Sequence, residues 1–149
     1  MDVGRICRRD PVSIDAKATL CKAAQLMRER HVGMLVATEG DVPETARVVG
    51  VLTDRDIVTA VVAREADPKG LTVQDVMTRS PLLAEETQAV EVAVRFMREL
   101  GVHRVPVVDQ GRVTGVLSLD DAIVAIADEL RDIAEAIRGG HKRERVARP

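Results

Sequence analysis

The chain has 149 residues, of which 46% are apolar, and a formal net charge of -2. This apolar content excludes a disordered chain, and a chain of this length buries roughly two-thirds of the surface that it exposes when unfolded. The near-neutral charge, with one Phe and no Tyr or Trp, argues against nucleic-acid binding, because the sequence offers neither a basic field nor aromatic platforms for bases.

The first half of the chain predicts a small β-α-β-β-α unit. A short extended stretch after Pro11 precedes an amphipathic helix, whose apolar residues recur at i, i+3, i+4 and i+7: Leu20, Ala23, Ala24 and Met27. Two β-branched runs, Met34 to Thr38 and Val48 to Leu52, flank a polar stretch from Glu39 to Ala46 with the composition of a hairpin loop. A second helix is predicted near residues 54–63.

The second half predicts the same order of elements. An extended stretch follows Pro81, and an amphipathic helix comes next, whose apolar stripe is Val90, Ala93, Val94 and Met97. Two β-branched runs then cover Val105 to Val108 and Val113 to Leu117. The closing helix is longer here, because its period continues from Leu119 to Ile137, where Gly139-Gly140 is predicted to stop it. Its last two turns pass the end of the repeat, which leaves two alternatives: a partner surface, or packing on its own domain.

The two halves align as an internal duplication over residues 3–63 and 73–128. A shift of 70 places Val3 on Val73, Pro11 on Pro81 and Met27 on Met97. After the polar stretch the shift becomes 65, and Gly50-Val51-Leu52 falls on Gly115-Val116-Leu117. We therefore predict a first repeat with its lead-in over 1–70, a second repeat with an extended helix over 71–138, and a basic flexible tail over 139–149.

Each repeat ends in a Ser/Thr-x-x-Asp turn between a strand and a helix, Thr53 to Asp56 and Ser118 to Asp121. One interpretation is structural: the hydroxyl and the carboxylate cap the helix as a capping box. The other is functional: a helix N-terminus and a hydroxyl receive a phosphate, and the carboxylate accepts hydrogen bonds from two ribose hydroxyls. The two interpretations are compatible, and the sequence leaves both open.

Two β-α-β-β-α copies, each ending in Gly-hydrophobic-hydrophobic-Ser/Thr-x-x-Asp, resemble a pair of CBS domains, the Bateman module. The segments around Gly33 and His103 are similar to that family's second strand, and the lead-ins that start at Val3 and Val73 also fit its pattern. The resemblance covers residues 3 to about 130. It implies an α/β (α+β) fold in which two repeats pack around a pseudo-two-fold axis.

The resemblance implies an adenosine-containing ligand (AMP, ADP or ATP, with NAD and S-adenosylmethionine as further candidates) in clefts between the repeats. Asp56 and Asp121 would then hold the ribose, with Thr53 and Ser118 near ribose and phosphate. The predicted surroundings of the adenine are the backbone at Gly33-Met34 and at His103-Arg104, the neighbouring Pro106, and the aliphatic side chains of Val12, Leu82 and Val105.

The phosphate of such a ligand requires cations, and Arg55 and Arg104 are the best that the sequence offers, followed by His103. The alternative for both arginines is an exposed surface position. The repeats differ here, because Gly33-Met34 stands where the second repeat has His103-Arg104, and Arg55 stands where it has Asp120. We therefore expect two clefts of unequal affinity.

No pattern in the sequence indicates catalysis. Walker-type loops, HExxH and Cys/His clusters are missing, and Cys7 and Cys21 are predicted to fill the core. Two cysteines without a CxxC motif, no apolar run of 18 residues and no signal-peptide pattern predict a cytoplasmic protein without a membrane partner.

Two functions remain as hypotheses. The first is a non-catalytic sensor module that binds an adenine nucleotide, needs no other cofactor, forms a homodimer by resemblance to the family, and acts on an unidentified effector protein. The second is a structural or dimerisation module without a ligand, which acts through protein contacts. The doubled Ser/Thr-x-x-Asp turn motivates the first hypothesis, and the long closing helix motivates the second.

Overall fold

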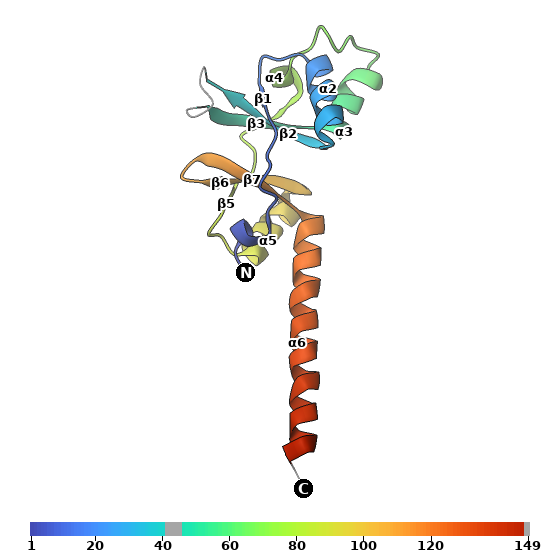
Figure 1. Cartoon of the computed structure of the whole chain (residues 1–149). Helices are drawn as coiled ribbons and strands as arrows, with labels where there is room; N and C mark the ends of the chain where they lie inside the picture. Colours follow the sequence, from blue (N-terminus) through green and yellow to red (C-terminus); the bar gives the residue numbers. More distant parts are fainter. Residues whose placement is uncertain (41–45, 148–149) are drawn as a thin grey trace.

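Two units of sheet and helix, one from each repeat, make up the body of the chain, and a single long helix leads away from them (Figure 1). The computed structural model describes residues 1–40 and 46–147, and it describes side chains as far as residue 139. The middle of the predicted hairpin loop, residues 41–45, and the side chains of the basic tail beyond residue 139 lie outside the described residues. The predicted α+β fold of two β-α-β-β-α repeats is confirmed.

The first unit follows the predicted order of elements. β1 (Ser13–Asp15) leads through α2 (Leu20–Arg30) to β2 (Met34–Glu39), which pairs in parallel with β1 and antiparallel with β3 (Arg47–Thr53). The α2 helix begins where the hydroxyl of Thr19 accepts a hydrogen bond from the backbone N–H of Lys22, at 3.2 Å. Its buried residues Leu20, Ala23 and Met27 are three of the four in the predicted stripe.

The closing helix of the first unit is divided into two kinds of helix. α3 (Asp54–Ile57) is a single α-helical turn, and the chain continues as the π-helical segment η1 (Val58–Val62). The predicted position near residues 54–63 is confirmed, whereas the π-helical geometry has no signal in the apolar period. β-branched valines at Val58, Val61 and Val62 lower the preference for a regular α-helix here.

The second unit repeats this order. Its elements are β5 (Ala84–Glu85), α5 (Val90–Leu100), β6 (Arg104–Asp109), β7 (Arg112–Ser118) and α6 (Leu119–Ala147). The register repeats as well: the hairpin β2–β3 shifts between Ala37 and Thr38, and the hairpin β6–β7 shifts at the equivalent place, between Val107 and Val108. The shared irregularity supports the duplication in three dimensions.

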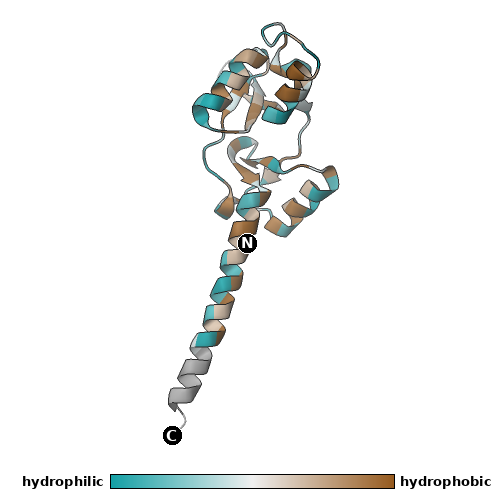
Figure 2. Cartoon of the chain, turned by 90° about the vertical axis from the view of Figure 1, so that its right-hand side faces the viewer, coloured by the Kyte–Doolittle hydropathy of each residue, from teal (hydrophilic) through white to brown (hydrophobic). Residues whose placement is uncertain are grey.

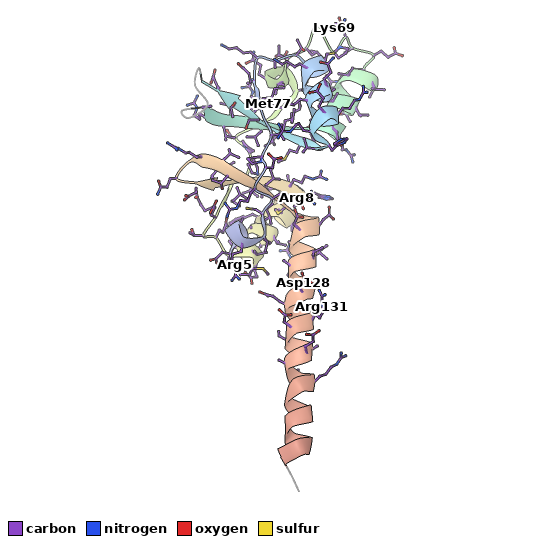
Figure 3. All side chains as sticks on the ribbon, in the orientation of Figure 1. Arg5, Arg8, Lys69, Met77, Asp128 and Arg131 are labelled. Carbon is purple, nitrogen blue, oxygen red and sulfur yellow. The ribbon has the colours of Figure 1, made fainter. Side chains whose placement is uncertain are left out.

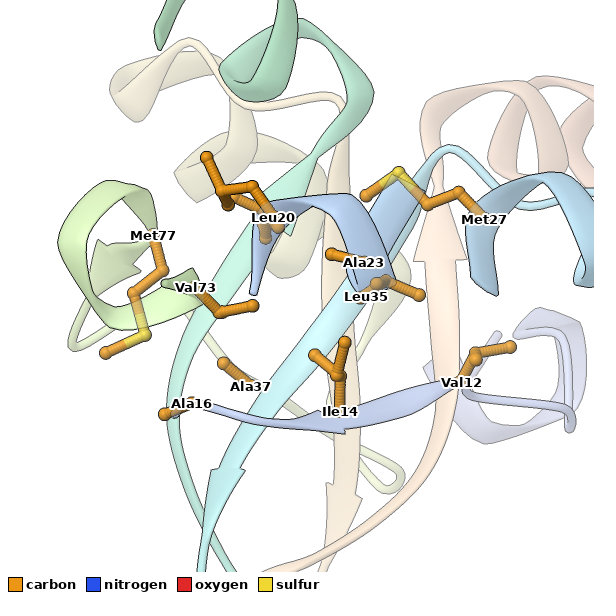
Figure 4. Packing of buried hydrophobic residues seen from close by; sticks show 11 residues of the cluster. Val12, Ile14, Ala16, Leu20, Ala23, Met27, Leu35, Ala37, Val73 and Met77 are labelled. Carbon is orange, nitrogen blue, oxygen red and sulfur yellow. The ribbon is translucent and has the colours of Figure 1, made fainter. Parts of the chain in front are cut away.

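The lead-in of each repeat packs on the other repeat. α1 (Val3–Ile6), which precedes the first unit, places Val3 and Cys7 in the core of the second unit. α4 (Val73–Val76), which precedes the second unit, places Val73 and Met77 in the core of the first unit. Figure 4 shows Val73 and Met77 beside Leu20 and Ala37 of that first core. The two repeats are therefore interlocked. The division of the chain into domains at residues 70/71 stays a prediction.

Backbone pairing holds each exchanged lead-in against a strand of the other unit. Arg8 and Val116 exchange two backbone hydrogen bonds of 2.9 and 3.0 Å, and β4 (Thr78–Arg79) pairs with Gly50 and Val51 of β3. A side-chain contact adds to the first pairing, because Arg9 forms an ion pair with Glu86. The hydrogen bond from Arg9 lowers the pKa of the Glu86 carboxyl below its usual value.

Glycine is required where the lead-ins cross the sheets. A Cβ on Gly115 would lie 2.6 Å from the carbonyl oxygen of Arg8 and 2.8 Å from the Sγ of Cys7. The equivalent glycine of the first repeat, Gly50, meets the side chain of Met77 in the same way. Cys7 is 8% exposed, as expected of a core residue, and burial raises the pKa of its thiol.

The prediction that Gly139-Gly140 ends the closing helix is wrong. α6 continues through both glycines to Ala147, so part of the segment predicted as a flexible tail is helical. Glycine lowers helix stability by about 1 kcal/mol relative to alanine but does not remove a backbone hydrogen bond. The residues that follow, from Lys142 to Arg145, are good helix formers, which explains why the helix extends past the pair.

We predict that Gly115→Ala destabilises the protein by about 1–3 kcal/mol, because the added methyl group must displace the backbone of the lead-in. Urea unfolding measures this loss. Gly139→Ala is the matched control: no atom lies within 4 Å of a Cβ at this position in α6, so the free energy of unfolding should not fall. A Gly115→Ala protein as stable as the parent would contradict the close approach.

Candidate functional site

A cavity of about 160 Å³ lies between the two units, where four segments distant in sequence meet. They are the lead-in before β1, the turn between α2 and β2, the start of β6, and the junction of β7 with α6. Figure 3 labels Arg8 at this level of the molecule, between the upper unit and the start of α6. The lining residues are Arg8, Asp10, Val12, His31, Val32, Gly33, Met34, Arg104, Val116, Ser118, Asp120 and Asp121.

The junction of β7 with α6 supplies a hydroxyl and a carboxylate. The hydroxyl of Ser118 accepts a hydrogen bond from the backbone N–H of Asp121 at 3.1 Å and donates one to its Oδ2 at 2.5 Å. Ser118 is 8% exposed, which makes it the one polar residue counted as buried in the described part of the chain. The Ser-x-x-Asp turn therefore caps α6, as the structural interpretation predicted, and still presents its carboxylate to the cavity.

The lead-in supplies a guanidinium to the same carboxylate. The Nε of Arg8 lies 3.2 Å from Oδ1 of Asp121, and the side chain of Arg8 is 77% exposed whereas that of Asp121 is 18% exposed. Such an exposed ion pair contributes only about 0–1 kcal/mol, so a ligand could displace it at little cost. The position of Arg8 itself is firmer, because its backbone is paired with Val116.

A second guanidinium reaches the cavity from β6. A Cβ on Gly33 would lie 3.6 Å from the Nη1 of Arg104 and 3.1 Å from the Oδ2 of Asp54. Arg104 of the second unit therefore reaches the backbone of Gly33 in the first unit, at a distance where an added Cβ would make an ordinary van der Waals contact. Two cations, Arg8 and Arg104, and the carboxylate of Asp121 thus border one cavity.

The equivalent turn of the first repeat is arranged differently. The carboxylate of Asp56 accepts a hydrogen bond of 2.8 Å from the backbone N–H of Thr53, and the hydroxyl of Thr53 accepts one of 3.2 Å from the backbone N–H of Asp56. This is a complete capping box. Asp56 borders a different hollow, which it shares with Thr59, Arg64 and Asp75 among others. Its carboxylate is held by backbone, whereas that of Asp121 is held by two side chains.

The cavity brings together six of the thirteen residues predicted for nucleotide binding: Val12, Gly33, Met34, Arg104, Ser118 and Asp121. The others lie elsewhere. Thr53 and Asp56 form the capping box, Arg55 and His103 are exposed, and Leu82 packs against the second core. Val105 and Pro106 are buried within β6; Val105 belongs to the second core, and neither residue lines this cavity.

Sequence reasoning missed the residues of the lead-in, above all Arg8 and Asp10. Their place in the cavity depends on the exchange of lead-ins, which a comparison of the repeats does not reveal. It also missed His31, which ends α2 with a φ of 52°, where the second repeat has Gly101 with a φ of 65°. The equivalence of His31 and Gly101 under the shift of 70 was the one available signal for a special backbone at this position.

Two absences bear on the chemistry. The described side chains include no group of three or more His, Cys, Asp or Glu residues arranged to hold a metal ion. Among the described helices, none combines the length and the apolar content needed to span a bilayer.

We predict that Ser118→Ala lowers the free energy of unfolding by about 0.5–2 kcal/mol, because the start of α6 loses its cap and Asp121 loses a donor. Chemical denaturation measures the change. Thr59→Ala serves as the comparison, since the hydroxyl of Thr59 bonds only to carbonyl groups of the preceding turn and lies on the exposed surface. Equal stability of the parent and Ser118→Ala would contradict the capping role.

The sequence matches the family model of the CBS domain twice, over residues 3–63 and 73–128. An uncharacterized protein of Methanopyrus kandleri is 28% identical over 146 residues, which cover 92% of this chain and 72% of that protein. The CBS domain-containing protein YhcV of Bacillus subtilis is 30% identical over 112 residues, 75% of this chain and 76% of that protein. The chain spans about a quarter of the Arabidopsis thaliana CBS domain-containing proteins that it matches at 32% identity.

Solved structures of similar shape support the same assignment. The CBS domain protein of Pyrobaculum aerophilum complexed with AMP is 33% identical, with a TM-score of 0.73 over 81% of this chain and 89% of that chain. A signal-transduction protein with CBS domains from Burkholderia ambifaria, described as putative, is 25% identical, with a TM-score of 0.75 over 85% and 93%. A hexameric CBS-CP12 protein from bloom-forming cyanobacteria is also 25% identical, with a TM-score of 0.74 over 93% and 85%.

Proposed function

Because the chain belongs to the CBS-domain family, as a tandem pair of CBS domains, we propose that it is a non-catalytic regulatory module that binds an adenosine-containing ligand. The proposed site is the cavity between the lead-in, the turn before β2 and the start of α6. The observation that carries the proposal is that the carboxylate of Asp121 and two guanidinium groups, Arg8 and Arg104, border one cavity between the units, which Asp10 and Asp120 also line. A ribose and a phosphate require those two kinds of group.

The ribose is proposed to bind at Asp121. In the structure the two carboxylate oxygens accept from Ser118 and Arg8, which are both side chains that can rotate. A pair of vicinal hydroxyls can replace these donors without disturbing a backbone hydrogen bond. The same replacement at Asp56 would break the bond from the N–H of Thr53, which is the physical reason to place the ligand at Asp121 first.

The phosphate is proposed to bind between the two guanidinium groups. A ribose that takes over the carboxylate of Asp121 releases Arg8 from its ion pair, and Arg104 enters the cavity from the opposite unit. Guanidinium groups form bidentate, charge-assisted hydrogen bonds with phosphate oxygens. The number of phosphates that the two arginines accommodate decides between AMP, ADP and ATP, while NAD and S-adenosylmethionine stay as further candidates.

The adenine is proposed to lie against the aliphatic wall of the cavity. Val12 and Met34 are 6% and 5% exposed and line the cavity together with Val116. They suit a flat apolar base in a chain that has a single aromatic residue. The complex of the Pyrobaculum aerophilum relative with AMP supports an adenine nucleotide as the ligand of this chain.

Binding in this cavity would couple to the arrangement of the two units. The cavity is lined by both repeats and by the first turn of α6, so a ligand that fits one arrangement better shifts the population toward it. We propose that a homodimer of the chain presents this change to an unidentified effector protein in the cytoplasm, without a further cofactor.

The alternative is a structural module without a ligand. Two observations favour it: both Ser/Thr-x-x-Asp turns cap helices, and α6 exposes a row of large apolar side chains. In this alternative the carboxylates act only through helix stability.

We predict that one of AMP, ADP, ATP, NAD and S-adenosylmethionine raises the melting temperature of the protein. A ligand at 100 times its Kd stabilises the folded state by about 2.7 kcal/mol, which a thermal melt resolves. Asp121→Asn should abolish the shift, because the amide donates where the ribose hydroxyls also donate. Asp56→Asn, the same change in the other repeat, should retain it.

Three outcomes of the melts decide between the hypotheses. A shift that Asp121→Asn removes and Asp56→Asn keeps supports the proposed site. A shift that only Asp56→Asn removes moves the ligand to the other repeat. No shift with any of the five compounds at millimolar concentration overturns the nucleotide function and leaves the structural module.

A further inference from the structure

The long helix α6 leaves the body of the protein after its first turns. Its main contacts among the described elements are with α1, α5 and β7. At 1.5 Å per residue its 29 residues extend over about 43 Å, and Figures 1 and 2 show most of this length standing apart from the two units. Most of the stability of helices in proteins comes from the packing of an apolar face, so a helix that stands apart from the fold calls for a partner.

Large apolar side chains recur along the solitary part, seen as brown bands in Figure 2. Five of them are from 45% to 65% exposed, and together they are named the α6 seam: Ile123, Ile126, Leu130, Ile133 and Ile137. Single exposed apolar residues are normal on a protein surface, but five in one row on one helix are the mark of an interaction site.

The spacing of the α6 seam is that of a coiled coil. Its members are separated by 3, 4, 3 and 4 residues, which places them at the a and d positions of consecutive heptads. At 100° per residue they fall within an arc of about 80°, narrower than the apolar face of a helix that packs on a sheet. Ala127 and Ala134 border the seam, and their small side chains allow a second helix to approach closely.

The distribution of charge along α6 identifies the occupant. Residues 119–136 contain six carboxylates and one guanidinium, whereas residues 137–147 contain four basic side chains and one carboxylate. The helix dipole accounts for charges only in the first and last turns, and Asp128, Asp132 and Glu135 lie in neither. A second copy of the same helix, running in the opposite direction, sets residues 119–129 of each helix, which contain four carboxylates, opposite residues 137–147 of the other.

The apolar residues also favour the antiparallel direction. In parallel coiled coils, Ile or Leu at a with Ile at d disfavours the two-stranded form. The α6 seam has Ile126 and Ile133 at d, so a parallel pair is not what this seam specifies. We propose that the α6 seam is a self-association surface, on which α6 of a second copy of this chain packs antiparallel as a two-stranded coiled coil. This inference names a surface for the proposed homodimer and does not depend on nucleotide binding.

Sedimentation analysis of the full chain tests the association. The double variant Ile126→Asp/Ile133→Asp places carboxylates inside the seam and should weaken association by about 100-fold or more. Val124→Asp is the matched control, because Val124 is 61% exposed on the same helix but lies outside the seam. It should associate as the parent does. A monomeric parent at tens of micromolar, or equal weakening by both variants, overturns the proposal.

Distances between spin labels test the direction, in a Cys21→Ser background in which Cys7 is buried and protected. Labels are placed at Ala125 and Glu135, which are about 15 Å apart along one helix. In a parallel, in-register pair, the 125–125 and 135–135 distances are both short. In an antiparallel pair only one position along the helix faces its own copy, so at least one of these two distances is long. Two short same-site distances contradict the antiparallel pair.

The nucleotide melts separate this inference from the proposed function. The seam variant should retain any nucleotide-induced shift of the parent, because the cavity residues are unchanged. Asp121→Asn should retain the association, because Asp121 is not part of the seam. If nucleotide binding fails while association persists, only the proposed sensor function is overturned. If association fails while nucleotide binding persists, only the proposal for the α6 seam is overturned.

Discussion

The exchange of the two lead-ins is the constraint on which the rest of the structure depends. Each lead-in crosses a strand of the other unit at a glycine, Gly50 or Gly115, where a Cβ would collide with the crossing chain. This close approach places Val3 and Cys7 in one core, and Val73 and Met77 in the other. Neither unit therefore completes its core without the other's lead-in, and the pair folds as one interlocked body.

The candidate site follows directly from this exchange. Backbone pairing with Val116 brings Arg8 to the start of α6, where Ser118 and Asp121 already form a helix cap. The site is thus made of a lead-in, a turn of the first repeat, and the starts of β6 and α6 in the second repeat. The duplicated turn at Thr53 and Asp56 also caps a helix, but its carboxylate accepts from the backbone, so the two copies of one motif are chemically unequal.

The sequence predicted the elements well, because they rest on local signals. Apolar periods, β-branched runs and a shift of 70 and then 65 located the helices, hairpins and repeats that the structure shows. Contacts that depend on chain crossing were not predictable in this way. No local signal distinguishes Arg8 from other exposed residues. Val105 was predicted to lie beside the adenine, but it is buried within β6. The prediction that α6 ends at Gly139-Gly140 failed for a different reason, since a glycine pair weakens a helix without ending it.

Photoaffinity labelling with an azido-adenine nucleotide tests most directly whether the ligand binds where the exchanged lead-in meets the first repeat. The account predicts saturable labelling, suppressed by excess unmodified nucleotide, on the peptides that contain Val12 or the Gly33-Met34 turn, because these line the cavity where the base is proposed to lie. Saturable labelling confined to peptides that contribute nothing to this cavity would contradict the account.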